Sequence, residues 1–372
     1  MERKRPMTRK ESRDELNKFN LACELLKTIR HFFPDLVNQL HRITDERDQR
    51  YIRYELELIL CVRILSVVFL LPSMRSISEE MNNDIIISNI SKLLHRDDIT
   101  ELPHFDTINK CLIQIPPIEL EAIICEIANR LIRSKTFLES RIRNRCWQIV
   151  IDGTRLYSFS EQHCIHCLFK EHKDRTGNVT SVEYYHYVLE AKLVLRENIV
   201  ISIATEFVEN NGTQQPGAGE KAKQDCELKS FYRMADKLKA AFPRLPVCLT
   251  MDSLYACEPV FQICGQNNWR YIIRFKDGSI KTVAEEFHVL KNLEAEQCLI
   301  EADDKSSRQY KFVLKMDYHG FMLNAAECIE TKSDGEKRTF VFITDLSINQ
   351  RNCAALVKAG RCRWRIERKR RV

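Results

Sequence analysis

The stretch CWQIVIDGTRLY, residues 146–157, marks a change of period in the sequence. Before it, apolar residues recur at intervals of three and four, which is typical of amphipathic helices. From this stretch on, β-branched and aromatic residues dominate short runs separated by turn-forming residues, as expected for strands. The first such run ends in Asp152 and is followed by Gly153. The sequence therefore predicts a helical region and then a sheet, with a carboxylate at the carboxyl edge, where α/β folds build their sites.

A second apolar strand repeats this arrangement, because CLTMDSLY (248–255) places Asp252 directly after it. Helices are expected over 225–242 and 258–267, and a further strand at RYIIRFK (270–276). The resulting order is three strands, helix, strand, helix, strand, insert and helix, which predicts a mixed sheet flanked by helices. Taken alone, each aspartate is equally explained as a cap of a strand or turn.

The predicted fold class is thus α/β, with four segments along the chain. An all-α N-terminal region, expected to bind DNA, precedes the sheet, and a β-rich insertion interrupts the core before its last helix. The expected boundaries are 1–140 for the helical region, 141–279 for the first part of the core, 280–347 for the insertion and 348–372 for the final helix.

Composition sets only broad limits on function. With 372 residues, 44% hydrophobic residues and a net charge of +6, the chain is ordinary for a globular protein, and its charge alone identifies no polyanionic partner. The start, MERKRPMTRK, lacks an apolar core, so no secretory signal is expected and the 15 cysteines are expected as reduced thiols. The most apolar run, ILSVVFLLP (64–72), is far shorter than the roughly 20 residues of a membrane helix. We expect a cytoplasmic protein without a membrane partner.

The last stretch, GRCRWRIERKRRV (360–372), places Glu367 as the single carboxylate within a basic run. Two strand-end aspartates and a glutamate on a late helix can converge on a pair of divalent ions, and such oxygen ligands suit Mg²⁺ or Mn²⁺. A metal pair stabilises the attacking and leaving oxygens of a phosphodiester displacement. Because the phosphodiester backbone also requires cations, the candidate DNA contacts are Arg363, Arg365 and Lys369. Arg363 shares a helix face with Glu367, so it could position a phosphate or pair with the glutamate.

In this order, Asp152, Asp252 and Glu367 resemble the acidic triad of the DDE transposases of bacterial insertion sequences. The resemblance also rests on DGT at 152–154, on a Cys/His-bearing stretch before YYH at 184–186, and on QDCELK and GRCRWRIE, at 224–229 and 360–367. The β-rich segment before the last helix is similar to the insertion domain of one branch of this family. Together these features cover about residues 102–367.

The resemblance implies a ribonuclease-H-like core in which Asp152, Asp252 and Glu367 are catalytic and hold Mg²⁺ or Mn²⁺. It implies cleavage of DNA at the ends of an insertion sequence and strand transfer into a target, without a covalent protein–DNA intermediate. The implied partners are double-stranded DNA, as terminal repeats and target, and a second copy of the chain in a homodimer. The implied location is the bacterial nucleoid.

Two departures from the family pattern bear on activity. Related transposases usually carry a tyrosine where this chain has Gly360, and a lysine seven residues after the glutamate, beyond Val372. We therefore expect a C-terminally truncated copy that cuts DNA poorly or not at all. The alternatives are an inactive DNA-binding remnant of a transposase and a zinc-dependent DNA-binding regulator without nuclease ancestry.

A cysteine–histidine cluster follows the first strand. Cys164 and Cys167 have C-x-x-C spacing, and His172 and His186 come after them. Two thiolates and two imidazoles form a suitable tetrahedral zinc set, so a structural zinc is one interpretation. The other is a reduced pair of thiols in the connection between two strands. In either case we expect the cluster to brace that connection and to take no part in catalysis.

Overall fold

The protein is described by a computed structural model that covers residues 21–196, 199–210, 225–293, 298–303 and 306–368. The chain divides into two compact units, Met1–Ile123 and Ile124–Val372. The boundary falls inside a continuous helix, α8 (Pro117–Arg133).

The first unit is helical throughout its described part. Its core forms around α4, which is apolar on nearly all sides and buries Ile59 and Val62 completely. A helix of this kind requires other helices around it, and α6 and α7 contribute Ile90 and Ile108 to the same core. The elements are α2 (Leu21–Phe32), α3 (Leu36–His41), η1 (Gln49–Tyr51), α4 (Leu56–Val68), α5 (Met74–Ser76), η2 (Ile77–Met81), α6 (Asp84–Leu94), α7 (Phe105–Leu112) and the first part of α8.

The second unit is built on an open, mixed sheet with ten strands among the described residues. The strands are β1 (Trp147–Phe159), β2 (Leu168–Lys173), β3 (Val179–Arg196), β4 (Ile199–Val208), β5 (Val247–Met251), β6 (Arg270–Phe275), β7 (Cys298–Asp303), β8 (Ser306–Tyr318), β9 (Phe321–Lys332) and β10 (Lys337–Thr344). The helices are η3 (Leu138–Ser140), α9 (Glu227–Ala241), η4 (Ser253–Tyr255), α10 (Glu258–Asn267), α11 (Lys281–Leu293) and α12 (Cys353–Arg368). The prediction of an α/β fold with a mixed sheet is confirmed.

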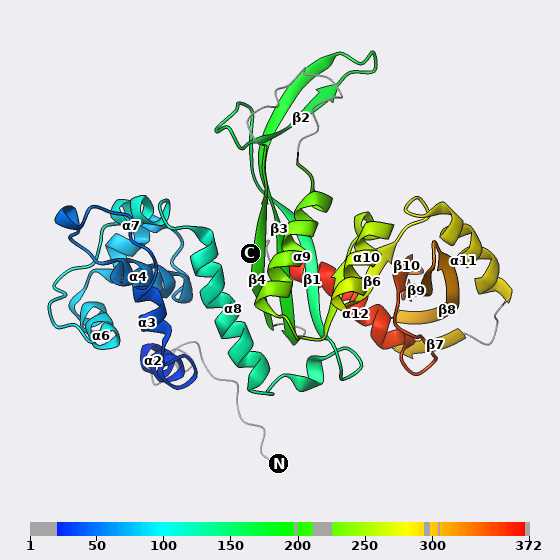
Figure 1. Ribbon diagram of the computed structural model, residues 1–372, viewed down its shortest axis with the longest axis horizontal. Helices are drawn as coiled ribbons and strands as arrows, with labels where there is room; N and C mark the ends of the chain where they lie inside the picture. Colours follow the sequence, from blue (N-terminus) through cyan, green and yellow to red (C-terminus); the bar gives the residue numbers. More distant parts are fainter. Residues whose placement is uncertain (1–20, 197–198, 211–224, 294–297, 304–305, 369–372) are drawn as a thin grey trace. The chain divides into compact units, whose positions relative to one another are not determined.

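The central strands follow the order β4-β3-β1-β5-β6, and β10, β9, β8 and β7 continue the sheet beyond β6. Strands β3 and β4 run antiparallel to their neighbours, whereas β1, β5 and β6 are parallel to one another. Strand β3 is long enough to change partner along one edge, pairing with β2 over its first part and with β4 over its second. The helices that connect the parallel strands, α9 and α10, pack against one face of this sheet (Figure 1).

Side chains alternate along β1, so neighbouring residues show which helices cover each face of the sheet. Ile149 and Ile151 are fully buried in the core formed with α9 and α10. Val150 points the other way and packs against Cys362 of α12. The amide of Gln148, on the same side as Val150, donates to the carbonyl of Ala359 at 2.8 Å. Helix α12 therefore covers the opposite face of the sheet, where it crosses β9, β6, β5 and β1.

Close packing of α12 depends on Gly360. A Cβ atom at this position would lie 2.6 Å from the ring of Phe342 on β10, well inside van der Waals contact. The ring of Phe342 thus occupies the space that a side chain at position 360 would need. The glycine at this position therefore has a packing reason.

The segment between β6 and α12, expected to be mainly β, opens with a helix. Helix α11 buries Val283, Ala284 and Phe287, whose spacing of one, three and four residues is that of a helix face. The strands β7 to β10 that follow form an antiparallel meander, and β10 pairs with β6 of the core. This segment is therefore continuous with the core sheet.

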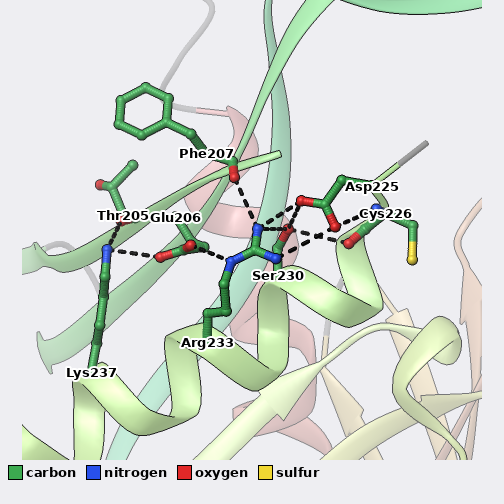
Figure 2. Close-up of polar contacts among 8 residues, drawn as sticks. All are labelled: Thr205, Glu206, Phe207, Asp225, Cys226, Ser230, Arg233 and Lys237. Atoms are coloured by element: carbon green, nitrogen blue, oxygen red, sulfur yellow. Dashed lines mark hydrogen bonds and ion pairs between the residues drawn. The ribbon is translucent and has the colours of Figure 1, made fainter. Parts of the chain in front are cut away.

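A charged network fastens α9 to strand β4 (Figure 2). Arg233 donates to Glu206 Oε1 at 2.6 Å and to Asp225 Oδ2 at 2.7 Å. Lys237, one turn further along α9, reaches Glu206 Oε2 at 2.7 Å. The Glu206 side chain is only 11% exposed, and two cations compensate its charge.

Among the described helices, none has the length and apolar character that crossing a bilayer requires.

Candidate acidic site and thiol cluster

Asp152 and Asp252 lie level with each other on neighbouring strands. The parallel register pairs Val150 with Thr250, so both aspartates come two residues later. Asp252 directly follows β5, as predicted, but Asp152 does not end its strand, because β1 continues along β3 to Phe159. Because side chains alternate, Asp152 shares the face of Val150, which α12 covers. The register thus brings both aspartates to one level of the sheet, the edge at which β5 ends.

Helix α12 reaches Asp152 through Arg363. Along the helix, Ala359 lies beside Gln148 and Cys362 beside Val150, so the next residue arrives near Asp152. There the guanidinium of Arg363 donates to Asp152 Oδ1 at 2.7 Å, with side chains only 14% and 13% exposed. The sequence predicted that Arg363 positions a phosphate or pairs with Glu367. The ion pair with Asp152 was not predicted.

Glu367 belongs to the same helix, one turn beyond Arg363, but its side chain lies outside the described residues, as does that of Arg365. Lys369 also lies outside them. One turn advances about 5.4 Å along a helix axis. The backbone of α12 therefore passes Asp152 before it arrives at Glu367, and the role of this glutamate stays a prediction.

A third carboxylate, Glu227, approaches the same edge from the other face. It is the first residue of α9 and accepts hydrogen bonds from the phenols of Tyr187 and Tyr255, each at 2.7 Å. Burial raises the pKa of Tyr187 above its usual range, and the charges of Glu227, Asp152 and Asp252 raise it further. The charges of all three carboxylates therefore raise the pKa of the same phenol, that of Tyr187.

Gly153 allows this approach. A Cβ atom at Gly153 would lie 1.9 Å from Tyr187 Oη and 2.7 Å from Glu227 Oε2. Only a residue without a side chain fits where these two groups cross β1. The glycine of the DGT motif is thus explained by packing around the acidic edge.

Cations flank the aspartates on the α12 face. Lys192 pairs with Glu190 at 3.1 Å, and burial lowers its pKa while the charge of Asp152 opposes that shift. Burial also lowers the pKa of Arg274 on β6, with the positive charges of Arg363 and Arg361 as further causes. Burial is the first cause of both shifts, and only Arg274 is also affected by neighbouring positive charge.

The donor set at the edge consists of hard oxygen atoms. Asp252 Oδ1 accepts the backbone N–H of Leu254 at 2.8 Å, which holds the carboxylate in one orientation. Oxygen donors in a fixed arrangement fit Mg²⁺ or Mn²⁺ better than a soft metal. The edge could therefore hold a divalent cation between Asp152 and Asp252, with cationic side chains beside it.

The thiol cluster is separate from the acidic edge. The sulfur atoms of Cys164 and Cys167 are 3.7 Å apart, and each lies 3.5 Å from Nε2 of His186. These three residues form a site compatible with a structural metal. Predicting these three together was correct, but His172 does not lie with them. It pairs with Ser181, further along the β2–β3 hairpin, where its ring is 3.6 Å from Glu183.

Sequence reasoning missed Glu227, Tyr187 and Tyr255 as parts of the acidic edge. Glu227 stands within QDCELK, and Tyr255 follows Asp252 by three residues, so both lay inside quoted stretches. Their convergence depends on how α9 packs against β1, which no spacing reveals. Comparison with other proteins adds no assignment, because no family model and no curated protein sequence matches this chain.

Proposed function

We propose that the second unit performs metal-dependent phosphodiester chemistry on DNA, as a transposase of the DDE type. The observation that carries the proposal is the level placement of Asp152 and Asp252, with α12 arriving beside them. Also in support, the order β4-β3-β1-β5-β6, in which β3 alone runs opposite to the other four strands, is the order expected of a ribonuclease-H-like core. The all-α first unit would serve as a further DNA-binding part.

In this proposal Asp152 and Asp252 hold Mg²⁺ or Mn²⁺, joined by Glu367 from α12. The ions would neutralise charge on the attacking and leaving oxygens of the scissile phosphate. Arg363 would release Asp152 and turn to the DNA backbone, and Lys192 and Arg274 would add positive charge on the same face. The substrate is double-stranded DNA at the ends of a mobile element, and a homodimer would hold two ends together.

A second candidate is a DNA-binding protein of the same ancestry that does not cut. It is favoured by the ion pair between Arg363 and Asp152, which engages an oxygen that metal binding requires. If this contact persists on DNA, the metal affinity of the edge is low. Binding would then proceed without hydrolysis.

A nicking assay separates these candidates. Labelled DNA from both flanks of the gene is incubated with the protein in Mn²⁺ or in EDTA, and binding is followed by gel shift. The first candidate predicts nicking only in Mn²⁺, weak in this chain and abolished in Asp152→Asn and in Asp252→Asn. The control, Asp317→Asn on β8, should nick as well as the wild type.

DNA that is bound but never nicked selects the second candidate. DNA that is neither bound nor nicked contradicts both. Nicking that survives in Asp152→Asn and Asp252→Asn would remove the acidic edge from the proposal.

A further inference from the structure

We propose that Cys164, Cys167 and His186 bind a zinc ion that locks strand β3 at the point where it changes partner. This proposal is independent of the acidic edge and of the proposed function.

The geometry of the three ligand atoms supports zinc. Zinc binds thiolate sulfur at about 2.3 Å and imidazole nitrogen at 2.0–2.1 Å, in a tetrahedron. Two sulfur corners of such a tetrahedron are then about 3.8 Å apart, and a sulfur and a nitrogen corner about 3.6 Å. The observed separations are 3.7 Å between the sulfurs of Cys164 and Cys167, and 3.5 Å from each sulfur to His186 Nε2. The three atoms therefore form one face of a zinc tetrahedron.

The two thiols are held in a fixed arrangement and are not joined as a disulfide. Cys167 is fully buried, and its sulfur accepts the backbone N–H of Cys164 at 3.4 Å. A disulfide requires sulfur atoms about 2.05 Å apart, far closer than those observed here. The C-x-x-C pair also lies in the connection between two strands, not at the start of a helix where redox pairs of this spacing occur.

Water completes the tetrahedron in this proposal. The neighbouring imidazole of His163 stacks on the ring of Phe159, with 5.0 Å between ring centroids. His163 is not one of the three residues whose ligand atoms lie together, so its removal should leave the metal in place.

The position of the cluster indicates what the zinc would do. Strand β2 pairs with β3 up to Tyr185, and β4 pairs with β3 from Tyr187 on, so His186 stands between the two partners. Cys164 and Cys167 belong to the connection that leads into β2. A zinc ion bound by these two cysteines and His186 would attach this connection to β3. It would thereby stabilise β3 at the residue where its partner changes from β2 to β4. Without the ion, β2 and the start of β3 should open more readily than the rest of the sheet.

Metal analysis of the full-length protein tests the proposal. The protein is purified from zinc-supplemented cells, and zinc is measured by plasma mass spectrometry. We expect about one zinc per chain, and a large loss in Cys164→Ser, Cys167→Ser and His186→Ala. The controls are Cys226→Ser, at an exposed thiol, His172→Ala and His163→Ala, all of which should keep the wild-type content.

Cobalt exchange gives a second measurement that requires no variant. Co²⁺ in wild-type protein should show a thiolate charge-transfer band and the strong visible absorption of tetrahedral cobalt. Chelation should increase amide exchange in residues 160–186 without a comparable increase in β5 or β6.

Zinc in wild-type protein no higher than in Cys164→Ser would overturn the proposal, as would an octahedral cobalt spectrum. Equal loss from His172→Ala and His186→Ala would contradict the ligand set, and loss from His163→Ala would contradict the water ligand. DNA nicking takes no part in these measurements, so failure here leaves the acidic edge unaffected.

Discussion

Gly153 is the residue on which the acidic edge most directly depends. Two polar groups, the phenol of Tyr187 and the carboxylate of Glu227, cross β1 within 3 Å of where its Cβ atom would be. Both belong to a single hydrogen bond and cannot retreat independently. A side chain at this position must therefore displace this hydrogen-bonded pair.

Gly153→Ala should reduce the free energy of unfolding by about 1–3 kcal/mol, the usual cost of overpacking. The measurement is urea denaturation followed by circular dichroism. The matched control is Gly265→Ala in α10, where an added Cβ meets nothing within 4 Å. That change should be neutral or stabilising by about 0.5–1 kcal/mol, because alanine favours a helix. Equal stability of Gly153→Ala and wild type would refute the packing argument.

Tyr255 makes stability depend on alkaline pH. Burial, and then the charge of Glu227, raises its pKa well above the usual value near 10. Above about pH 10 the unfolded state loses the phenolic proton while the folded state keeps it, so the free energy of unfolding falls as pH rises. For one fully shifted group the slope approaches about 1.4 kcal/mol per pH unit.

Tyr255→Phe should make this decline shallower, as measured by urea midpoints from about pH 9 to pH 11. Tyr51→Phe, at an exposed position, should leave the wild-type slope unchanged. A slope in Tyr255→Phe as steep as in wild type would show that this phenol is not responsible.

At the scale of single residues, the sequence predicted where a residue lies along the chain's elements better than which residues it contacts. Asp152 and Asp252 were found because each directly follows an apolar run. The prediction that Asp152 ends its strand was wrong, because β1 continues along β3 to Phe159, which no local pattern reveals. Glu227 was not singled out, since its bonds to Tyr187 and Tyr255 arise only when α9 packs back on β1. His172 was chosen beside His186 because spacing does not reveal how far along a hairpin each histidine lies.

At the scale of elements, helix α9 is held by charge as well as by its apolar face. Arg233 joins the end of β4 to the residues that precede α9, since it contacts Glu206, Asp225 and the carbonyl of Phe207 (Figure 2). These contacts, the hydrogen bond to Asp225 first, raise the pKa of Arg233. The network therefore positions the first turn of α9, which carries Glu227.

Arg233→Ala should lower the free energy of unfolding by about 1–2 kcal/mol, less than for a fully buried pair because the guanidinium is partly exposed. Glu206 would then rely on Lys237 alone. Arg50→Ala, which removes an exposed ion pair with Asp48, should leave stability unchanged. Chemical denaturation of both variants provides the measurement, and an equal effect of the two would contradict a special role for the Arg233 network.

Element types were predicted well where the pattern was strong and poorly where it was mixed. Strands β5 and β6 are short apolar runs, and the first part of β1 is equally apolar, so each of these strands was recognised. Helix α11 was taken as part of a β region because its apolar residues are few and its flanks are polar. Its helical face becomes evident only with the strands it covers, β8 in particular.

At the scale of the whole molecule, the acidic edge should couple metal binding to stability. A ligand that binds only the folded state stabilises it, by about 1.4 kcal/mol at ten times its Kd. Mn²⁺ should therefore raise the thermal midpoint of the wild-type protein by several degrees.

The double variant Asp152→Asn/Asp252→Asn should lose this response, whereas Asp317→Asn should retain it. Zinc must be kept constant in all samples, so that the thiol cluster does not contribute. Differential scanning fluorimetry with and without Mn²⁺ is the measurement. An unchanged Mn²⁺ response in the double variant would place the cation elsewhere.

The pairing of β10 with β6 restricts how this chain can be shortened. If the segment from α11 to β10 were a separate domain joined to the core only by loops, its removal would leave the remaining strands unchanged. Here its excision would strip β6 of a neighbour and expose a row of backbone amides and carbonyls, which invites pairing between molecules. A trimmed version would need to retain β10, or carry charged residues along β6, to remain monodisperse.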